Sequence, residues 1–389
     1  MALTLRTRGE SRSNEPRFQA KVTRTAIAQI GQRQDYVLVT SGSGNAFCGD
    51  NLSGYAAIVS TESEKPASFG SANTPLVIVR RTDHLKPGHI VTVEPKSGTV
   101  LTVFRPESRH NVIFTTDRCN SNCLMCSQPP KDVDDRWRIR EHLRVLDLIE
   151  APPEFLCITG GEPTLLGDDL ITLLSCINTK LPGTRVQMLT NGRTYADATY
   201  TQRLASVGHP TFISAIPLYA DIAGIHDYIV QAEGAFDQTV EGLYNAADAG
   251  LAVEIRVVLH KQSIPRLPQL AEYIYRNFPF TAHIALMGME HMGYVKKNWE
   301  DLWIDPFEYM LTLEEAVRFL WQRRMNVSIY NLQLCLLPRS LWSFARRSIS
   351  DFKNDYVEEC EQCIQKNHCA GLFSSQLANY SQHLKAITA

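Results

Sequence analysis

The most informative stretch of this 389-residue chain is residues 117–126, which read DRCNSNCLMC. Its cysteines, Cys119, Cys123 and Cys126, are spaced C-x3-C-x2-C. A tight loop with this spacing can direct three thiolates at three corners of a cubane cluster, because iron–sulfur clusters are bound by thiolates. The fourth iron then has no protein ligand and is open to a small molecule with an amine and a carboxylate. The alternatives are three unrelated cysteines, or a zinc site whose fourth ligand lies elsewhere, although zinc sites favour C-x2-C pairs.

Around this stretch, short apolar runs typical of strands alternate with amphipathic runs typical of helices. Six strands are predicted, over residues 111–116, 155–159, 185–189, 211–217, 253–259 and 282–287. This alternation predicts an α/β fold with parallel strands joined by crossover helices. Six units do not close an eight-stranded barrel, so we expect an open sheet or a partial barrel. The functional site is expected at the carboxyl ends of the strands, where the cysteine loop follows the first strand.

The rest of the chain divides by composition. Residues 1–24 are polar and are predicted to be flexible. Residues 25–105 contain short β-like segments separated by turn signals, which predicts a small β-rich N-terminal domain. The alternating region covers residues 106–305, and residues 306–389 form a cysteine-rich C-terminal region.

Composition narrows the classes of protein to consider. The net charge is −2, so the basic surplus of a dedicated nucleic-acid binder is missing and no nucleic-acid partner is expected. No run of about 18 apolar residues and no signal-peptide pattern is present, so we expect a cytoplasmic protein without a membrane partner. Thiols stay reduced there, and the ten cysteines are then metal ligands, redox groups or core residues.

A second motif ends the second predicted strand. Residues 159–163 read TGGEP. Glycines let the backbone approach a ligand closely, and backbone carbonyls with a carboxylate suit an ammonium group. Alone this turn is a weak signal. It lies, however, at the end of the first predicted strand that follows the cysteine loop.

Together the two motifs resemble those of the radical S-adenosylmethionine (SAM) superfamily. The resemblance implies a partial (β/α)6 TIM-like barrel and a [4Fe–4S] cluster on Cys119, Cys123 and Cys126. It also implies that the turn Gly160, Gly161, Glu162 and Pro163 binds the amino group of SAM. The reduced cluster cleaves SAM, and the 5′-deoxyadenosyl radical abstracts hydrogen from an unactivated carbon. This first step requires an electron donor but no acid–base pair, so no catalytic residue is assigned beyond the cluster. Relatives commonly carry an aromatic residue before the last cysteine, where this chain has Met125.

Three further residues are candidates for SAM binding. Asn191 belongs to a Thr-Asn-Gly turn that closes the third predicted strand and resembles the turn found there in relatives. Ser214 lies in the fourth strand, where relatives often use polar side chains, although its side chain can face either way. Arg256 lies in an apolar strand and needs a partner, which is either the SAM carboxylate or a structural ion pair with Glu162 or Glu254.

A second cysteine group lies in the C-terminal region. Cys360, Cys363 and Cys369 are spaced C-x2-C-x5-C, and Cys335 lies upstream as the natural fourth ligand. Four thiolates suit either an iron–sulfur cluster or structural zinc. The resemblance favours an auxiliary [4Fe–4S] cluster, because the spacing matches part of the auxiliary-cluster domain of radical SAM enzymes that modify peptides. His368 is an alternative ligand beside Cys369.

Several stretches resemble one family in particular, the C-type maturases of the His-Xaa-Ser system. These stretches are residues 119–130, 285–294, 330–338 and 348–369. The resemblance implies a ribosomally synthesised substrate with His-Xaa-Ser repeats and a second radical SAM maturase as a partner. Two other functions stay open: radical SAM chemistry on a small molecule or nucleotide in cofactor biosynthesis, and a non-catalytic iron–sulfur or zinc protein.

Overall fold

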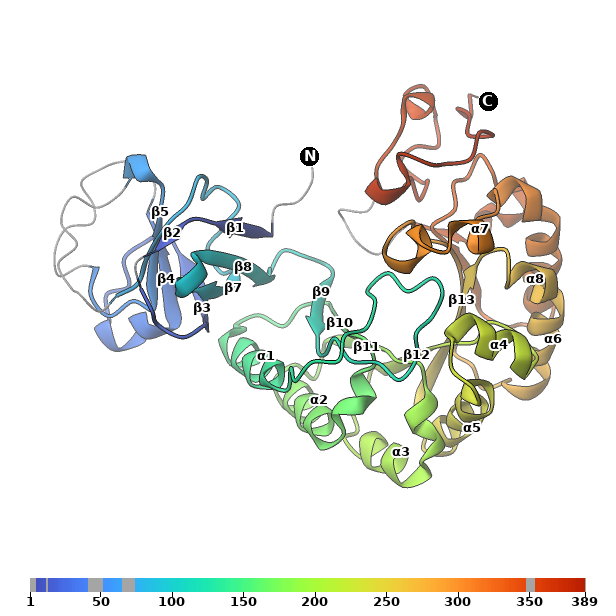
Figure 1. Cartoon of the computed structure of the whole chain (residues 1–389), viewed down its shortest axis with the longest axis horizontal. Helices are drawn as coiled ribbons and strands as arrows, with labels where there is room; N and C mark the ends of the chain where they lie inside the picture. Colours follow the sequence, from blue (N-terminus) through green and yellow to red (C-terminus); the bar gives the residue numbers. More distant parts are fainter. Residues whose placement is uncertain (1–4, 12, 41–51, 65–73, 348–353, 389) are drawn as a thin grey trace. The chain divides into compact units, whose positions relative to one another are not determined.

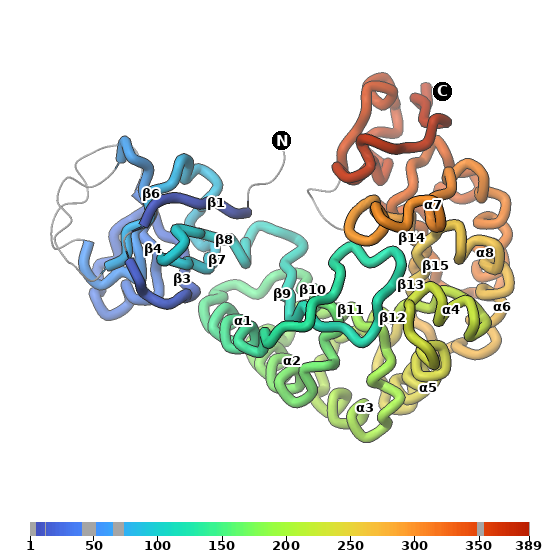
Figure 2. The backbone as a smooth tube through the Cα atoms, viewed as in Figure 1, coloured from blue at the N-terminus to red at the C-terminus, as the bar shows by residue number. Residues whose placement is uncertain are grey.

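The computed structural model describes residues 5–11, 13–40, 52–64, 74–347 and 354–388. The chain forms two compact units, shown as a ribbon in Figure 1 and as a tube in Figure 2. The first comprises Met1–Ile113, Trp137–Glu154 and Thr179–Thr184, and the second comprises the remaining residues. Within the described ranges, no helix combines the length and the apolar character needed to span a bilayer.

The first unit is built on a mixed sheet with the strand order β1-β8-β7-β3-β4-β5-β6-β2. Its core consists mainly of valines, since β-branched side chains pack well on a pleated surface. Helix α1 (Trp137–Leu148) packs Val145 and Leu148 against Ile90 and Phe104 of the sheet. The strands are β1 (Arg6–Arg8), β2 (Glu10–Ser11), β3 (Phe18–Thr23), β4 (Tyr36–Val39), β5 (Ala57–Ser60), β6 (Leu76–Ile78), β7 (Ile90–Glu94) and β8 (Thr99–Phe104).

The prediction of a flexible segment over residues 1–24 was wrong for much of its described part. Strand β3 lies inside the sheet, where it pairs with β4 and β7, and its Ala20 and Val22 are fully buried. Lys21 forms an ion pair with Glu150 and lies over the ring of Tyr36. The polar residues that suggested flexibility are thus partnered through tertiary contacts, which composition does not reveal.

A second, parallel sheet has the order β16-β15-β14-β13-β12-β11-β10-β9 and is flanked by helices (Figure 1). The strands are β9 (Asn111–Phe114), β10 (Phe155–Thr159), β11 (Arg185–Leu189), β12 (Phe212–Pro217), β13 (Ala252–Leu259), β14 (His283–Gly288), β15 (Val327–Tyr330) and β16 (Ala345–Arg346). The helices are α2 (Asp168–Lys180), α3 (Ala198–Ala205), α4 (Ala223–Val230), α5 (Ala235–Asp248), α6 (Leu267–Asn277), α7 (Trp299–Leu302) and α8 (Met310–Gln322).

The predicted parallel α/β fold of a partial barrel is confirmed, but the number of strands was too small. Strands β15 and β16 extend the sheet beyond the six predicted ones. They have four and two residues, so each is too short to give a clear alternation in the sequence.

The two faces of this sheet differ in chemistry. Cα partners across parallel strands put Ile158, Met188 and Ile255 on one buried apolar face. The same registers put Glu254 and Arg256 on the opposite face. Figure 1 shows the helices on the outer side of the curved sheet. Apolar side chains therefore face the helices, while polar side chains gather on the inner face.

Candidate active site

The start of the cysteine loop is held by a buried carboxylate, Asp135, which is 1% exposed. The hydroxyl of Thr116 donates to its Oδ1 at 2.9 Å, and the backbone N–H of Asp117 donates to its Oδ2 at 2.5 Å. The Nε of Arg118 lies 3.6 Å from Oδ1. Because both carboxylate oxygens are partnered, the backbone that leads into Cys119 has little freedom.

The middle of the loop is bound to the end of helix α4. The N–H groups of Asn122 and Leu124 donate to the carbonyls of Val230 and Ile229, each at 2.9 Å. Carbonyls in the last turn of a helix have no hydrogen-bond partner inside the helix, and here the loop supplies the N–H donors.

The far end of the loop is held by the segment that follows β14. The N–H of Tyr294 donates to the carbonyl of Cys126 at 2.8 Å, and the Asn298 side chain donates to the carbonyl of Leu124 at 2.8 Å. Gly293 has a φ of 59°, and a Cβ there would overlap the same Cys126 carbonyl. Only glycine permits this close approach.

The two sequence motifs lie against each other. The N–H of Gly161 donates to the carbonyl of Thr116 at 2.7 Å, and the N–H of Glu162 donates to the carbonyl of Arg118 at 2.8 Å. A Cβ on Gly161 would overlap the Arg118 carbonyl, and one on Gly160 would lie 2.7 Å from that of Thr116. These glycines are needed because another backbone passes directly beside them.

The Glu162 carboxylate is fully buried, and its oxygens form hydrogen bonds within the protein. It accepts hydrogen bonds from the N–H and hydroxyl of Thr164 (2.9 and 2.6 Å), from the hydroxyl of Thr190 (2.7 Å) and from the N–H of Asn191 (2.6 Å). Burial raises the pKa of Glu162, and these hydrogen bonds act in the opposite direction. The side chain therefore joins the turn after β10 to the turn after β11.

The turn after β11 also reaches the cysteine loop. The Asn191 side chain donates to Oδ1 of Asn120 at 2.6 Å and lies 4.0 Å from the sulfur of Cys119. The Arg193 guanidinium donates to the Asn120 carbonyl and, at 3.1 Å, to the Ser121 hydroxyl. Asn191 is thus brought to the loop as the sequence predicts. Sequence reasoning missed Arg193, although it follows the Thr-Asn-Gly turn directly.

The three thiols of the loop are partly buried and electrostatically coupled. Burial raises the pKa of Cys119 to about 11 and that of Cys123 to about 12, and it also raises the pKa of Cys126. Thiolates are the form that binds iron, and a bound metal deprotonates a thiol outright. Cation binding at these thiols would therefore be coupled to the release of their protons. Met125 is 8% exposed and packs with Tyr219 and Met289.

The structure does not bring Ser214 to this site. Its fully buried hydroxyl is hydrogen-bonded to the hydroxyl of Tyr195 at 2.9 Å, on the apolar face of the sheet. Pro163, in contrast, is buried directly after the glycine turn, where it begins a short 3-10 helix.

Arg256 lies on the inner face and has protein partners. Its Nε lies 3.7 Å from the carboxylate of Glu254, and an Nη lies 2.9 Å from the sulfur of Met287. Of the structural ion pairs that the sequence allowed, the one with Glu254 is present. Glu254 also accepts from the amide of Gln187 at 3.1 Å and lies 2.8 Å from Nδ1 of His283, so it centres a polar network that sequence reasoning missed.

The second cysteine group is gathered around one pocket. The backbone N–H of Leu334 lies 3.4 Å from the Cys369 sulfur, and that of Ile387 lies 3.5 Å from the Cys363 sulfur. Such N–H donors stabilise negative charge on cluster sulfurs. His368 is exposed and does not line this pocket. The pocket's cysteines are Cys335, Cys360, Cys363 and Cys369.

Within the described ranges, no three His, Cys, Asp or Glu side chains are grouped closely enough to hold a single metal ion. A cubane cluster imposes a different geometry, because each thiolate binds a different iron. The assignment of both cysteine groups as cluster ligands therefore stays a prediction.

Residues 113–274 match the family model of the radical SAM superfamily. The chain carries a radical SAM domain. Enzymes of this superfamily use a [4Fe–4S] cluster and SAM. The matched segment includes both the cysteine loop and the glycine turn.

The radical SAM chain is similar to two curated proteins over part of its length. One is the Fe-coproporphyrin III synthase of Methanosarcina barkeri, with 29% identity over 163 residues, 41% of this chain and 39% of that protein. The other is a probable GTP 3′,8-cyclase of Saccharolobus islandicus, with 27% identity over 154 residues, 39% of this chain and 48% of that protein. The matches thus span less than half of each relative.

Two solved structures overlap with the radical SAM chain at low similarity. SuiB of Streptococcus suis bound to SAM has a TM-score of 0.46 and 16% identity, covering 58% of this chain and 51% of its own. Coproporphyrinogen III oxidase of Escherichia coli has a TM-score of 0.43 and 14% identity, covering 56% and 54%. These overlaps carry no argument about substrate.

We predict that Gly161→Ala separates the two motifs. The new methyl group overlaps the Arg118 carbonyl, which is backbone and cannot rotate away, so we expect a loss of about 1–3 kcal/mol of stability. Reconstituted protein should retain less iron and form less 5′-deoxyadenosine from SAM. The matched control is Gly224→Ala, where nothing lies within 4 Å of the added Cβ. Unchanged iron content in the Gly161 variant would contradict the packing argument.

We also predict that Asp135→Asn loosens the start of the loop. The amide keeps the shape of the carboxylate but turns one acceptor into a donor that faces the N–H of Asp117 or the hydroxyl of Thr116. A cost of about 1–3 kcal/mol is expected in thermal unfolding, together with slower SAM cleavage. Asp134→Asn is the control, because Asp134 forms only an exposed pair with Arg136 and should change stability by less than about 0.5 kcal/mol. Equal effects of the two substitutions would refute the role of Asp135.

Proposed function

We propose that this radical SAM enzyme modifies a ribosomally synthesised peptide or protein, and that Cys119, Cys123 and Cys126 hold the cluster that cleaves SAM. The observation that carries the cluster assignment is the pair of backbone hydrogen bonds between the cysteine loop and the Gly160–Pro163 turn. They bring the sulfur ligands beside the turn that the resemblance assigns to the SAM amino group.

The residues of the site fit a cluster with one vacant iron. Three partly buried thiols lie on one loop, and the backbone of the glycine turn passes directly beside that loop. When bound, the cluster supplies the electron that cleaves SAM and so yields a radical able to take hydrogen from an unactivated carbon. The role of Asp135 is to fix the loop, and that of Glu162 is to fix the two turns. Met125 and Tyr219 supply an apolar wall that excludes water.

We further propose that the C-terminal cysteines hold an auxiliary [4Fe–4S] cluster. The support is their shared pocket, the two N–H donors aimed at sulfurs, and the resemblance to auxiliary-cluster domains. Lys366 and Lys385 also line the pocket, and their charge offsets that of four thiolates.

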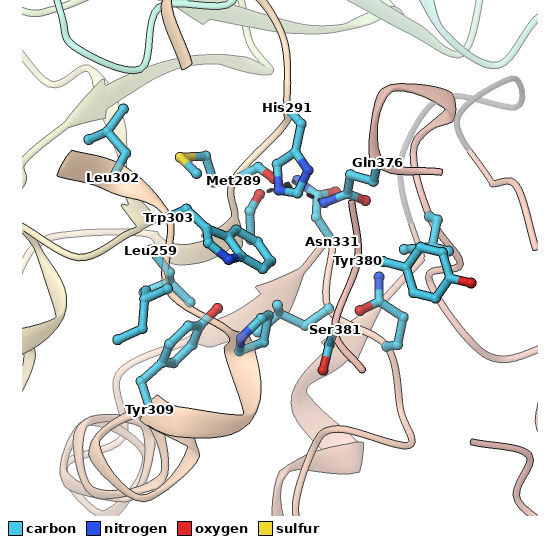
Figure 3. Close-up of a pocket in the computed structure, with 16 residues that line it drawn as sticks. Leu259, Met289, His291, Leu302, Trp303, Tyr309, Asn331, Gln376, Tyr380 and Ser381 are labelled. Atoms are coloured by element: carbon cyan, nitrogen blue, oxygen red, sulfur yellow. Dashed lines mark hydrogen bonds between the residues drawn. The ribbon is translucent and has the colours of Figure 1, made fainter. Parts of the chain in front are cut away.

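A peptide substrate is supported by the resemblance to His-Xaa-Ser maturases. Two of the stretches that carry it, residues 285–294 and 330–338, contribute to a pocket at the carboxyl ends of β14 and β15 (Figure 3). Residues 348–353 of a third stretch lie outside the described residues. An electron donor and a second maturase are the partners that this function requires or implies.

The second candidate is chemistry on a small molecule or nucleotide in cofactor biosynthesis. It is favoured by the names of the curated relatives, a coproporphyrin synthase and a GTP cyclase. Mass spectrometry separates the two candidates. A peptide encoded beside this gene should lose hydrogen or gain a cross-link under anaerobic, reducing conditions with SAM, whereas GTP and porphyrins should be unchanged.

We predict that Cys126→Ala abolishes SAM cleavage. With one thiolate missing, the loop offers only two ligands, so the iron content should fall from about eight to about four per chain. The measurements are iron and sulfide analysis and the yield of 5′-deoxyadenosine from anaerobic, reduced protein. Cys176→Ala, in helix α2, is the control and should keep both values. Full cleavage by the Cys126 variant would contradict the ligand assignment.

A different result is expected for Cys360→Ala. This variant should lose the auxiliary cluster, retain about four irons and still cleave SAM, while modification of the peptide stops. His368→Ala is the matched control and should keep about eight irons, since His368 does not line the pocket. One zinc per chain in the unaltered protein, lost in the Cys360 variant, would instead identify a structural zinc site.

A further inference from the structure

A pocket lies at the carboxyl ends of β13, β14 and β15 (Figure 3). Leu259 and Gly288 are the last residues of β13 and β14, and Asn331 follows β15. The C-terminal segment supplies the opposite wall with Leu372 and Gln376. Among the described residues, sixteen line the pocket, and none of these is an aspartate, glutamate, lysine or arginine. A charged group entering this pocket would lose its hydration without a counter-ion.

The pocket lies between the two cysteine groups. Met289 and Trp303 line it, and both pack in the apolar cluster that also contains Cys123. Gln333 and Leu372 line both this pocket and the pocket of the C-terminal cysteines. A substrate group held here would therefore share packing neighbours with both cysteine groups.

An aromatic group forms one side of the pocket. The rings of Trp299 and Trp303 are stacked, with centroids 4.9 Å apart and an angle of 15°. The ring of His291 stands edge-on to both, at 4.9 and 5.0 Å and at angles of 87° and 89°. This packing fixes the orientation of the imidazole. In Figure 3 it lies between Trp303 and Gln376.

His291 is 5% exposed, and its Nδ1 has no hydrogen-bond partner among the residues that the structure describes. The neighbouring amides donate to other groups: Gln376 donates to the Met289 carbonyl at 3.0 Å, and Gln333 donates to that of Gly371 at 2.7 Å. A buried nitrogen without a partner is rare enough to need an explanation.

The charge state of His291 fits an acceptor. Burial lowers the pKa of His291 to about 4, and a hydrogen bond to the backbone of Asn379 acts in the opposite direction. The ring is therefore neutral near pH 7. A neutral imidazole has one nitrogen that accepts, and Nδ1 is the one left for a ligand.

We propose that this pocket binds a neutral side chain with a flat ring, and that the N–H or O–H group of this side chain donates a hydrogen bond to Nδ1 of His291. The inference rests on the proposed function for its assumption of a peptide substrate. The uncharged lining selects against lysine, arginine, aspartate and glutamate, and the indole of Trp303 provides a wall for a ring. His291 is then a specificity-determining residue that positions the substrate beside the SAM cluster.

The test compares two probes that differ by one hydroxyl, N-acetyl-tyrosinamide and N-acetyl-phenylalaninamide. Isothermal titration of the reconstituted holoenzyme should show that the tyrosine probe binds about two- to tenfold more tightly, because only it can donate to His291. His291→Phe should remove this preference and leave the affinity for the phenylalanine probe unchanged. N-acetyl-lysinamide should not bind.

His291→Asn is the matched variant, because its amide keeps an acceptor near the position of Nδ1 and should preserve the preference for the tyrosine probe. Equal affinity of the two probes for the unaltered protein, or no binding of either, overturns the inference whether or not the variants fold. An equal loss of affinity for both probes in the His291→Phe variant also overturns the inference, since that result indicates a structural role of His291.

SAM cleavage without any peptide, measured in parallel, keeps the two proposals apart. If a peptide is modified but the probes show no preference, the pocket inference alone fails. If the preference holds but neither SAM is cleaved nor a peptide modified, the proposed function alone fails.

Discussion

Two backbone hydrogen bonds, from Gly161 to Thr116 and from Glu162 to Arg118, hold the site together. They connect the loop after the first strand of the parallel sheet to the turn after the second. The close approach requires glycine, because any Cβ at position 161 overlaps a carbonyl that is itself fixed. The loop thus owes its position to neighbouring backbone as well as to any cluster it binds. Backbone hydrogen bonds with the end of helix α4 and with the segment after β14 hold the rest of the loop in the same way.

Two buried carboxylates support this arrangement from within the protein. Asp135 and Glu162 are almost completely inaccessible, and burying an ionised group is costly unless hydrogen bonds compensate. Each is compensated by hydroxyl and backbone N–H donors of the segments it orders. Their oxygens therefore serve the architecture of the site, which leaves backbone groups of the turn for the proposed contact with SAM. This modifies the expectation that the Glu162 carboxylate itself meets an ammonium group.

Sequence patterns predicted the parts of the fold that depend on local order. Strand–helix alternation located β9 to β14, and the strand ends located both motifs, since those features follow from periodicity and from the topology of parallel sheets. The patterns failed where tertiary contacts decide. Strand β3 lies in a segment whose polar residues suggested flexibility, and β15 is too short to show a period. Ser214 faces the helices because its register follows from strand pairing. Asp135 could not be found, because its partners, Thr116 and Asp117, precede it by 19 and 18 residues. His291 could not be found, because its burial depends on tertiary packing.

The family match and the substrate pocket occupy different parts of the chain. The radical SAM match ends at residue 274, whereas every lining residue of the pocket except Leu259 lies beyond it. The matched part contains the cysteine loop and the glycine turn, so it accounts for SAM chemistry that relatives with different products share. The part beyond it supplies His291, Trp303 and the wall that is shared with the C-terminal cysteines. Under the proposed function, substrate choice therefore depends on residues outside the family match.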